Sequence, residues 1–281
     1  MSQRPDTPDL TNPRAQRVKA VRALSGRSAR ERHGRFLVEG PQGVRELLRY
    51  APAMADDLYL TVAAAQRYPE IVTAADSAQV RRHLGTQAVL QAMSADAQGV
   101  LAVARIEFAD GLALLTGDPP PTLVPLLAQV RDPGNAGTVI RAADAAGADA
   151  VLLSTESVQV HNPKTVRSTA GSMFHLPIAP GMDLAEAVTA ARAAGMNVLA
   201  ADGSGEFDLQ DLADGPVAGI DLAAPTMWLL GNEAHGLSEP ERALADAVVR
   251  IGMHRAESLN LAMAATLCLY ASARAQRKEW R

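Results

Sequence analysis

Apolar and polar residues follow one another along this chain in short blocks that predict alternating strands and helices. In the C-terminal part, continuous apolar runs of strand length, such as TLVPLLAQV and TMWLLG, are separated by segments in which apolar residues recur at helical spacing. The expected strands are 122–130, 150–153, 174–178, 197–202, 226–231 and 248–253, and the expected helices are 137–147, 162–171, 183–195, 240–247 and 258–277. This alternation indicates an α/β fold with a parallel sheet covered on both faces.

The N-terminal part predicts a smaller α/β unit. The expected helices are 14–32 and 42–51, and the expected strands are 36–40, 57–61 and 100–106. Between the two parts, the three consecutive prolines of GDPPP cannot continue a helix or a central strand. We therefore expect an N-terminal domain at 1–116, a linker at 117–121 and a larger domain at 122–281.

Charge is distributed unevenly over the two parts. The whole chain of 281 residues has a formal net charge of −4, but residues 1–50 hold 11 basic and 5 acidic residues. Clustered arginines, densest in a basic arm at about 1–35, can make sequence-independent contacts with phosphates. A solvated basic helix would have the same composition, so this stretch alone leaves an RNA partner and a plain surface equally open.

Several classes of protein are disfavoured by composition. The single cysteine, Cys268, can form neither an internal disulfide nor a thiolate metal cluster, which fits a reducing cytosol. The N-terminus lacks the apolar stretch of a signal peptide, and the longest apolar stretch, near 259–273, is short of a membrane span. We expect a soluble cytoplasmic protein with no metal site and no membrane partner.

Three loops carry the candidate chemistry, and each is expected near the carboxyl end of a strand, where open α/β sheets bind ligands. The loops are RDPGNAG (131–137), GNEAHGLS (231–238) and GMHRAESLN (252–260). Taken singly, each is most simply a turn. Together they place polar residues inside Ala- and Leu-rich segments, where a bound ligand would supply the hydrogen-bond partners that these side chains need. Neither a G-x-G-x-x-G fingerprint nor a Walker A lysine is present.

The three loops together resemble the motifs of the SpoU/TrmH class of the SPOUT superfamily, which are S-adenosylmethionine-dependent RNA 2′-O-methyltransferases. The resemblance rests on DPGNAGTVIRAADAAG, LLGNEAHGLS and IGMHRAESLNLAMAA and covers 122–277. The connecting segment NPKTVRSTAGSMFHLPI matches as well, and RERHGRFLVEGPQGVRELL resembles the RNA-binding domain often fused to these enzymes. One departure is Gly252, which stands where the family usually has proline.

The resemblance implies a small N-terminal substrate-binding domain and a C-terminal parallel-sheet domain with a deep trefoil knot, in which S-adenosylmethionine binds bent. It also implies a homodimer and an RNA substrate. The fused N-terminal domain favours 23S ribosomal RNA, with a transfer RNA 2′-O-methyltransferase as the alternative. A non-catalytic RNA-binding protein of ribosome assembly and a nucleotide-binding oxidoreductase are the rivals from other classes.

The site residues follow from the same resemblance. The sulfonium of the cofactor already supplies the electrophile, so the protein has to position a ribose hydroxyl and help remove its proton. We expect Arg141 to grip substrate phosphate and stabilise the developing oxyanion. The resemblance assigns the remaining roles as follows: Asn135, Glu233 and Asn260 with Arg141 in catalysis; Leu230, Gly231, Asn232, Ile251, Met253, Ser258 and Leu259 at the cofactor; and Arg35, Lys164 and Arg167 at the RNA. Cys268 is expected to be core.

Overall fold

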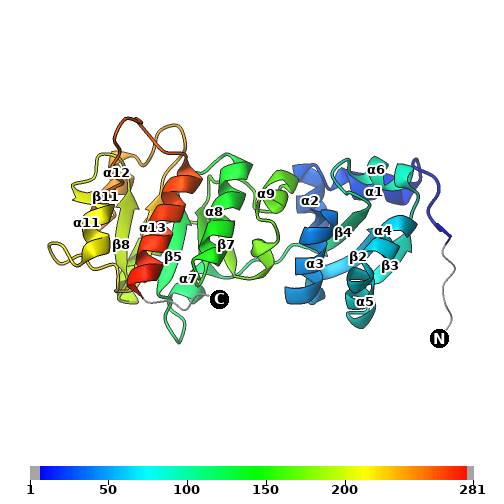
Figure 1. The fold of residues 1–281 in the computed structure, drawn as a ribbon, viewed down its shortest axis with the longest axis horizontal. Helices are drawn as coiled ribbons and strands as arrows, with labels where there is room; N and C mark the ends of the chain where they lie inside the picture. The colour runs from blue at the N-terminus through cyan, green and yellow to red at the C-terminus, as the bar shows by residue number, and fades with distance from the viewer. Residues whose placement is uncertain (1–6, 277–281) are drawn as a thin grey trace. The chain divides into compact units, whose positions relative to one another are not determined.

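The computed structural model describes residues 7–276, which fall into two compact units (Figure 1). The first unit comprises the chain up to residue 107 together with residues 161–175, and the second comprises 108–160 and the chain from 176 onward. The division comes before the predicted linker at 117–121. Helix α7 (Gly111–Leu115) belongs to the second unit because Leu115 packs with Met182 and Ala187 in its core.

The second unit is built on a seven-stranded sheet in which every strand pair is parallel, as predicted. The strand order is β7-β6-β5-β10-β8-β11-β9. The strands are β5 (Leu123–Leu127), β6 (Val151–Ser154), β7 (Ile178–Met182), β8 (Asn197–Ala201), β9 (Phe207–Asp208), β10 (Thr226–Leu230) and β11 (Ala247–Arg250). The central strands β5 and β10 are buried along their whole length, which explains their continuous apolar runs.

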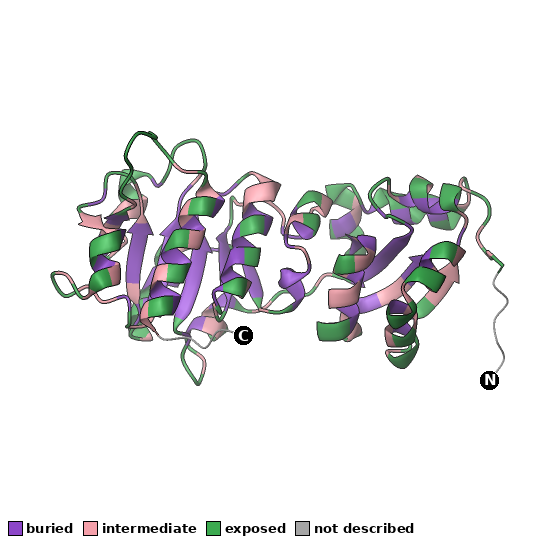
Figure 2. Cartoon of the chain, in the orientation of Figure 1, coloured by how far each residue is buried: buried purple, intermediate pink, exposed green. Residues whose placement is uncertain are grey.

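Side chains of these strands alternate between the two faces of the sheet. Val124 and Met227 point into one core cluster, which also contains Val188 of helix α10 (Leu184–Ala193). The opposite face is covered by α8 (Pro133–Ala145) and α13 (Leu261–Ala275), which pack against each other. Figure 2 shows buried strands behind helices whose outer faces are exposed. Two short helices, α11 (Leu209–Asp214) and α12 (Glu239–Arg242), complete the unit.

The first unit has a four-stranded sheet of order β1-β4-β2-β3, with β4 antiparallel to β1 and β2 and with β2 parallel to β3. The strands are β1 (Arg35–Glu39), β2 (Ala55–Leu60), β3 (Arg81–Leu84) and β4 (Val100–Arg105). The helices are α1 (Gln16–Ala23), α2 (Arg27–His33), α3 (Gly40–Tyr50), α4 (Val62–Arg67), α5 (Pro69–Ser77), α6 (Gln87–Met93) and α9 (Pro163–Ser168). The 3₁₀ turns are η1 (Pro52–Met54) and η2 (Ser172–Phe174). An α/β unit was predicted here.

Several boundaries differ from the predicted ones, two of them because a capping side chain was overlooked. Asp132 caps α8 by accepting a hydrogen bond from Asn135 N at 2.8 Å, so the helix begins at Pro133 rather than at 137. Asn260 caps α13 in the same way, so 258–260 remain in the loop. The expected helix at 14–32 breaks at Gly26, the N-cap of α2. The expected strand at 174–178 begins at Ile178 because Phe174 lies in η2.

No helix among residues 7–276 is long and apolar enough to cross a membrane.

A buried hydrogen bond ties α13 to the sheet and provides a test of the packing. The Trp228 indole Nε1–H donates to Ser272 Oγ at 2.9 Å, and both side chains are fully buried. Ser272→Ala leaves a buried donor unsatisfied, so we expect the free energy of unfolding to fall by about 1–3 kcal/mol, measured by urea denaturation with circular dichroism. Thr189→Ala, which removes an exposed hydroxyl from α10, is the control. Equal midpoints for the two variants would contradict this role of Ser272.

Candidate active site

The three loops singled out from the sequence meet at the carboxyl edge of the second unit's sheet. Strands β5 and β10 are parallel neighbours, in register from Leu123 opposite Thr226 to Leu127 opposite Leu230. The loop after β5 and the loop after β10 therefore leave the sheet side by side. The third loop, 251–260, runs from β11 to the start of α13, which packs on α8.

A chain of hydrogen bonds joins one side chain from each loop. Asn135 Nδ2 donates to Glu233 Oε1 at 3.3 Å, and Asn260 Nδ2 donates to Asn135 Oδ1 at 3.0 Å. Asn260 Oδ1 in turn accepts from Ala262 N at 2.9 Å, which caps α13. Three of the four predicted catalytic residues therefore form one network, which we call the Glu233–Asn135–Asn260 network.

Contacts with backbone groups hold the first part of the loop after β10. The carboxylate of Glu233 also accepts from Asp132 N at 3.1 Å and Arg131 N at 3.4 Å, close to the N-terminus of α8. Asn232 Nδ2 donates to Gln129 O at 2.7 Å, and Asn232 Oδ1 accepts from Ala234 N at 2.8 Å. The first two loops are thus bonded to each other by side chains and backbone together.

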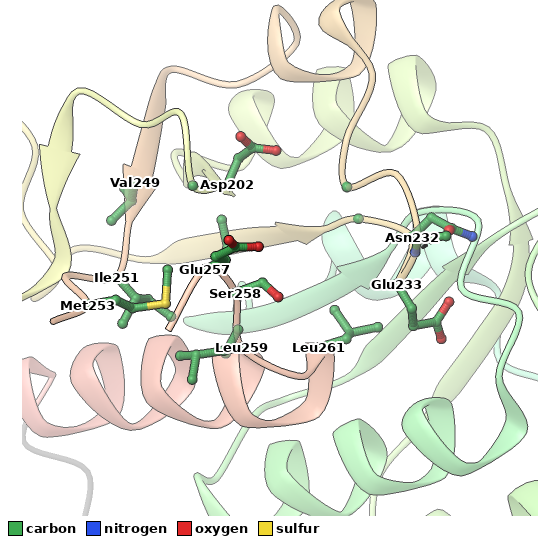
Figure 3. A pocket seen from close by; sticks show the side chains of 16 residues that line it. Asp202, Asn232, Glu233, Val249, Ile251, Met253, Glu257, Ser258, Leu259 and Leu261 are labelled. Carbon is green, nitrogen blue, oxygen red and sulfur yellow. Dashed lines mark hydrogen bonds between the residues drawn. The ribbon is translucent and has the colours of Figure 1, made fainter. Parts of the chain in front are cut away.

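Beside this network lies a cavity of about 330 Å³ (Figure 3). Its wall is formed by Ala201, Asp202, Gly203, Gly231, Asn232, Glu233, Ala234, Gly236, Val249, Ile251, Met253, Glu257, Ser258, Leu259, Leu261 and Ala264. All of the predicted cofactor residues except Leu230 are among them. Leu230 is buried, and its carbonyl accepts a hydrogen bond from Ala128 N at 2.8 Å.

Gly231 is required by the shape of the loop itself. A Cβ at this position would lie 2.4 Å from Gly236 C and 2.5 Å from Leu237 N, closer than any side chain can approach backbone. The loop closes on itself here, with Asn232 N donating to Gly236 O at 3.1 Å and Gly236 N donating to Asn232 O at 2.8 Å. The sequence interpretation placed the cofactor against Gly231, and the structure adds that the chain itself already fills that space.

Arg141 does not line the cavity. It lies on α8, beyond Asn135, with an exposed side chain that has no hydrogen bond or ion pair within residues 7–276. The structure of one chain therefore does not unite this predicted catalytic residue with the other three.

Asp202 is a cavity residue that the sequence analysis missed. Burial alone would raise the pKa of its carboxyl, but hydrogen bonds from Ser204 and Leu237 N, together with Arg242 at 3.7 Å, hold that pKa below its usual range. Its position at the end of β8 was the available signal, because that end lies at the same edge of the parallel sheet as the motif loops.

The predicted RNA-binding residues belong to the first unit. Arg35 pairs with Asp56 at 2.6 Å, and Arg167 pairs with Asp96 at 3.0 Å and with the buried carboxylate of Glu39. Lys164 is exposed on α9. Arg35 and Arg167 are therefore already engaged by carboxylates of the same unit.

No group of three or more His, Cys, Asp or Glu side chains in the described part of the chain could hold a metal ion. Cys268 is fully buried in α13, and burial raises the pKa of its thiol to about 12. An unionised, inaccessible thiol cannot act as a nucleophile, so the expectation that Cys268 is core is confirmed.

Comparison with known families identifies the second unit. A model of the SpoU rRNA Methylase family matches residues 122–270, more than half of the chain and all three loops of the site. The chain belongs to the SpoU rRNA Methylase family. A model of the MRM3-like substrate binding domain matches residues 15–102, within the first unit.

Two ribosomal RNA methyltransferases and one solved structure show how far the similarity extends. A 23S rRNA (guanosine(2553)-2′-O)-methyltransferase of Bacillus subtilis is 30% identical over 91% of this chain and 95% of its own length. A 23S rRNA (uridine(2479)-2′-O)-methyltransferase of Streptomyces viridochromogenes is 41% identical, but that alignment spans only 50% of this chain and 49% of the relative. The crystal structure of an AdoMet-bound rRNA methyltransferase from Sinorhizobium meliloti has a TM-score of 0.80 at 28% identity, covering 94% of this chain and 97% of that one.

These similarities confirm the predicted class, an S-adenosylmethionine-dependent RNA methyltransferase. They weigh against the oxidoreductase and the non-catalytic assembly protein that the sequence left open.

The closed loop after β10 generates a prediction for cofactor binding. Gly231→Ala forces the backbone of the loop apart at Gly236, so we expect the affinity for S-adenosylmethionine to fall about tenfold or more, measured by calorimetry. Gly26→Ala adds the same methyl group in the first unit at an ordinary contact distance and serves as control. An unchanged dissociation constant for Gly231→Ala would show that the loop tolerates the added atom.

Proposed function

We propose that this SpoU family member transfers a methyl group from S-adenosylmethionine to a ribose 2′-hydroxyl of 23S ribosomal RNA. The single observation that carries the proposal is the Glu233–Asn135–Asn260 network, which holds all three motif loops around one cavity. The names of the Bacillus and Streptomyces relatives support the choice of ribosomal over transfer RNA. A ribosomal substrate also supports a cytoplasmic location.

The cavity wall suits the cofactor. Val249, Ile251 and Leu259 provide an apolar surface of the kind that holds an adenine ring, and the exposed glycines at 203 and 236 leave backbone groups accessible. Asn232, Ser258 and the carboxylates of the wall provide hydrogen-bonding groups for the hydroxyls and the ammonium group. When bound, S-adenosylmethionine supplies an activated methyl group.

The reaction then needs a positioned hydroxyl. The bound cofactor would supply its methyl carbon to the ribose 2′-oxygen with loss of the carbon–sulfur bond, and the hydroxyl proton would pass to water or to a phosphate oxygen of the RNA. Negative charge grows on the 2′-oxygen as the proton leaves. We assign Arg141 to stabilise that charge and to hold the adjacent phosphate, because a guanidinium donates in a fixed planar fork and stays protonated. Asn135 positions the loop on which the substrate rests.

Because Arg141 lies outside the cavity, we propose that the active protein is a homodimer. Helix α13 presents an apolar stripe to solvent, with Met263 62%, Leu267 47% and Tyr270 40% exposed. These residues recur at the spacing of one helix face, which is how a helix presents an interface. Since α8 packs beside α13, a second copy that covers the stripe also lies beside the helix that carries Arg141. The site is then completed by groups from both copies.

We also propose the trefoil knot that the family resemblance implies. Two close backbone approaches at the carboxyl edge support it. A Cβ at Gly205 would lie 2.5 Å from Arg250 N and 2.7 Å from Val248 O, so the loop after β8 lies directly against β11. Gly231 has the equivalent contact with the far end of its own loop. Close packing of this kind is compatible with a threaded loop.

The first unit is proposed to bind the RNA, in agreement with its match to a substrate binding domain. Arg14, Lys19, Arg22 and Arg32 are exposed and have no carboxylate partner in the described chain. They are better placed to contact phosphates than Arg35 and Arg167, which already pair with carboxylates. Deleting residues 1–116 is a poor test of this role. Residues 161–175 belong to the same compact unit, so the deletion would also remove the residues against which they pack.

Arg141 provides the test of the proposed chemistry. Arg141→Ala should lower the rate of single-turnover methyl transfer by roughly a hundredfold or more, because a group that stabilises developing charge is lost. Arg141→Lys should recover little of it, since an ammonium lacks the planar fork. Calorimetry should find S-adenosylmethionine binding unchanged in both, because Arg141 does not line the cavity.

The matched control is Arg192→Gln, which removes an exposed arginine of α10 whose surface ion pair with Asp246 contributes little stability. Turnover of Arg141→Ala at the wild-type rate would remove this residue from the mechanism.

The dimer is tested separately by sedimentation equilibrium. Leu267→Glu places a charge in the middle of the exposed stripe, so we expect it to shift the protein from dimer to monomer and to abolish methyl transfer while S-adenosylmethionine still binds. Ala193→Glu, on the exposed face of α10, should remain dimeric. A Leu267→Glu protein that stays dimeric would place the interface elsewhere.

A further inference from the structure

The wall of the cofactor cavity carries three carboxylates and no cationic side chain. Asp202, Glu233 and Glu257 line it, whereas Lys, Arg and His are missing from the residues of the wall. This is an uneven charge distribution for a cavity whose wall is otherwise made of small and apolar residues. In the view of Figure 3, Asp202 and Glu257 lie near the middle of the cavity and Glu233 near one end.

Two of the three carboxylates are already engaged by the protein. Glu233 accepts from Asn135 Nδ2 and from the backbone N–H groups of Arg131 and Asp132. Asp202 accepts from Ser204 and lies 3.7 Å from the guanidinium of Arg242. Both carboxylates are therefore already held by hydrogen bonds from the protein itself.

Glu257 differs from both. It is exposed, lies just before Ser258 in the third motif loop, and has no hydrogen bond or ion pair to any residue among 7–276. Arg255, two residues away, does not pair with it. Glu257 is therefore the one carboxylate of the wall whose charge no other group of the described chain offsets.

The two ligands that this cavity must exchange during turnover differ in charge. S-adenosylmethionine carries a sulfonium, an ammonium and a carboxylate, so its net charge is positive. S-adenosylhomocysteine, which remains after the methyl group has left, has lost the sulfonium charge and is neutral overall. The two molecules share every other polar group.

We propose that Glu257 makes the cavity selective for the cationic cofactor over the neutral product, so that loss of the methyl group itself weakens binding and promotes product release. The inference rests on the proposed function. An uncompensated carboxylate attracts a cation within a few ångströms and gains nothing from a neutral group at the same place. At the effective dielectric of a solvent-exposed cavity, one such charge changes affinity by roughly three- to tenfold.

The experiment measures dissociation constants by calorimetry for three ligands with the full-length protein. The ligands are S-adenosylmethionine, S-adenosylhomocysteine and sinefungin, which has an amine-bearing carbon in place of the methylated sulfur. Sinefungin restores the positive charge without a sulfonium, so it separates charge from the chemistry of the methyl group. The variants are Glu257→Gln and the control Glu239→Gln, an exposed glutamate of α12 outside the cavity wall.

We expect Glu257→Gln to weaken S-adenosylmethionine and sinefungin by roughly three- to tenfold and to leave S-adenosylhomocysteine within about twofold of wild type. For the wild-type protein, a higher salt concentration should bring the affinities for the two cationic ligands closer to the affinity for S-adenosylhomocysteine, because salt screens an exposed charge. Glu239→Gln should behave as wild type.

Equal weakening of all three ligands would overturn the proposal, because Glu257 would then hold a group that they share. Unchanged affinities for all three would overturn it as well. Failure of the proposed function has a different signature, since it is read from the methylated product or from a wild-type protein that binds none of these ligands, and neither result depends on comparing Glu257→Gln with wild type. Circular dichroism of Glu257→Gln checks that the fold is intact.

Discussion

The active site depends on the parallel pairing of β5 with β10. That pairing brings the loop of the first motif and the loop of the second motif out of the sheet side by side, although about a hundred residues of chain separate them. Only then can Glu233 reach the N-terminus of α8 and Asn135. Each hydrogen bond of the Glu233–Asn135–Asn260 network is worth only about 0.5–3 kcal/mol, so the network refines an arrangement that the buried strands impose.

The arrangement also explains why so few residues carry the site. Asn135 and Asn260 each use one amide to bond a neighbouring loop, and Asn260 caps α13 with the same side chain. Asp202 binds the loop after its own strand and the far end of the loop after β10. The cavity is thus framed by polar groups that hold loops in place, while Glu257 and Arg141 have no hydrogen bond or ion pair to residues 7–276 of the same chain and are available to ligands.

Sequence analysis found the parts of this structure that are encoded locally. Strands β5, β6, β8 and β10 were predicted because strands buried on both faces need continuous apolar residues. The three motif loops were predicted because their glycines and amide side chains interrupt segments that are otherwise rich in Ala and Leu. Short elements such as β9, with two residues, and β3, with only partly buried residues, have too weak a pattern to be read.

What sequence could not supply was the effect of tertiary contacts. Residues 161–175 lie between two motifs along the chain, yet Arg167 pairs with Glu39 and Asp96, so this segment packs in the first unit. The hydrophobic periodicity of this segment does not indicate which of the two units it packs in. The sequence also could not show that Arg141 is exposed outside the cavity. Other loops build that cavity, so the spacing between Arg141 and Asn135 does not say whether the Arg141 side chain faces it.

The most direct test of the whole account is the product itself: unmethylated 23S ribosomal RNA is incubated with the purified protein and S-adenosylmethionine, digested to nucleosides and analysed by mass spectrometry. The account predicts one new 2′-O-methylated nucleoside, whereas a base-methylated nucleoside or RNA without a new methyl group would contradict it.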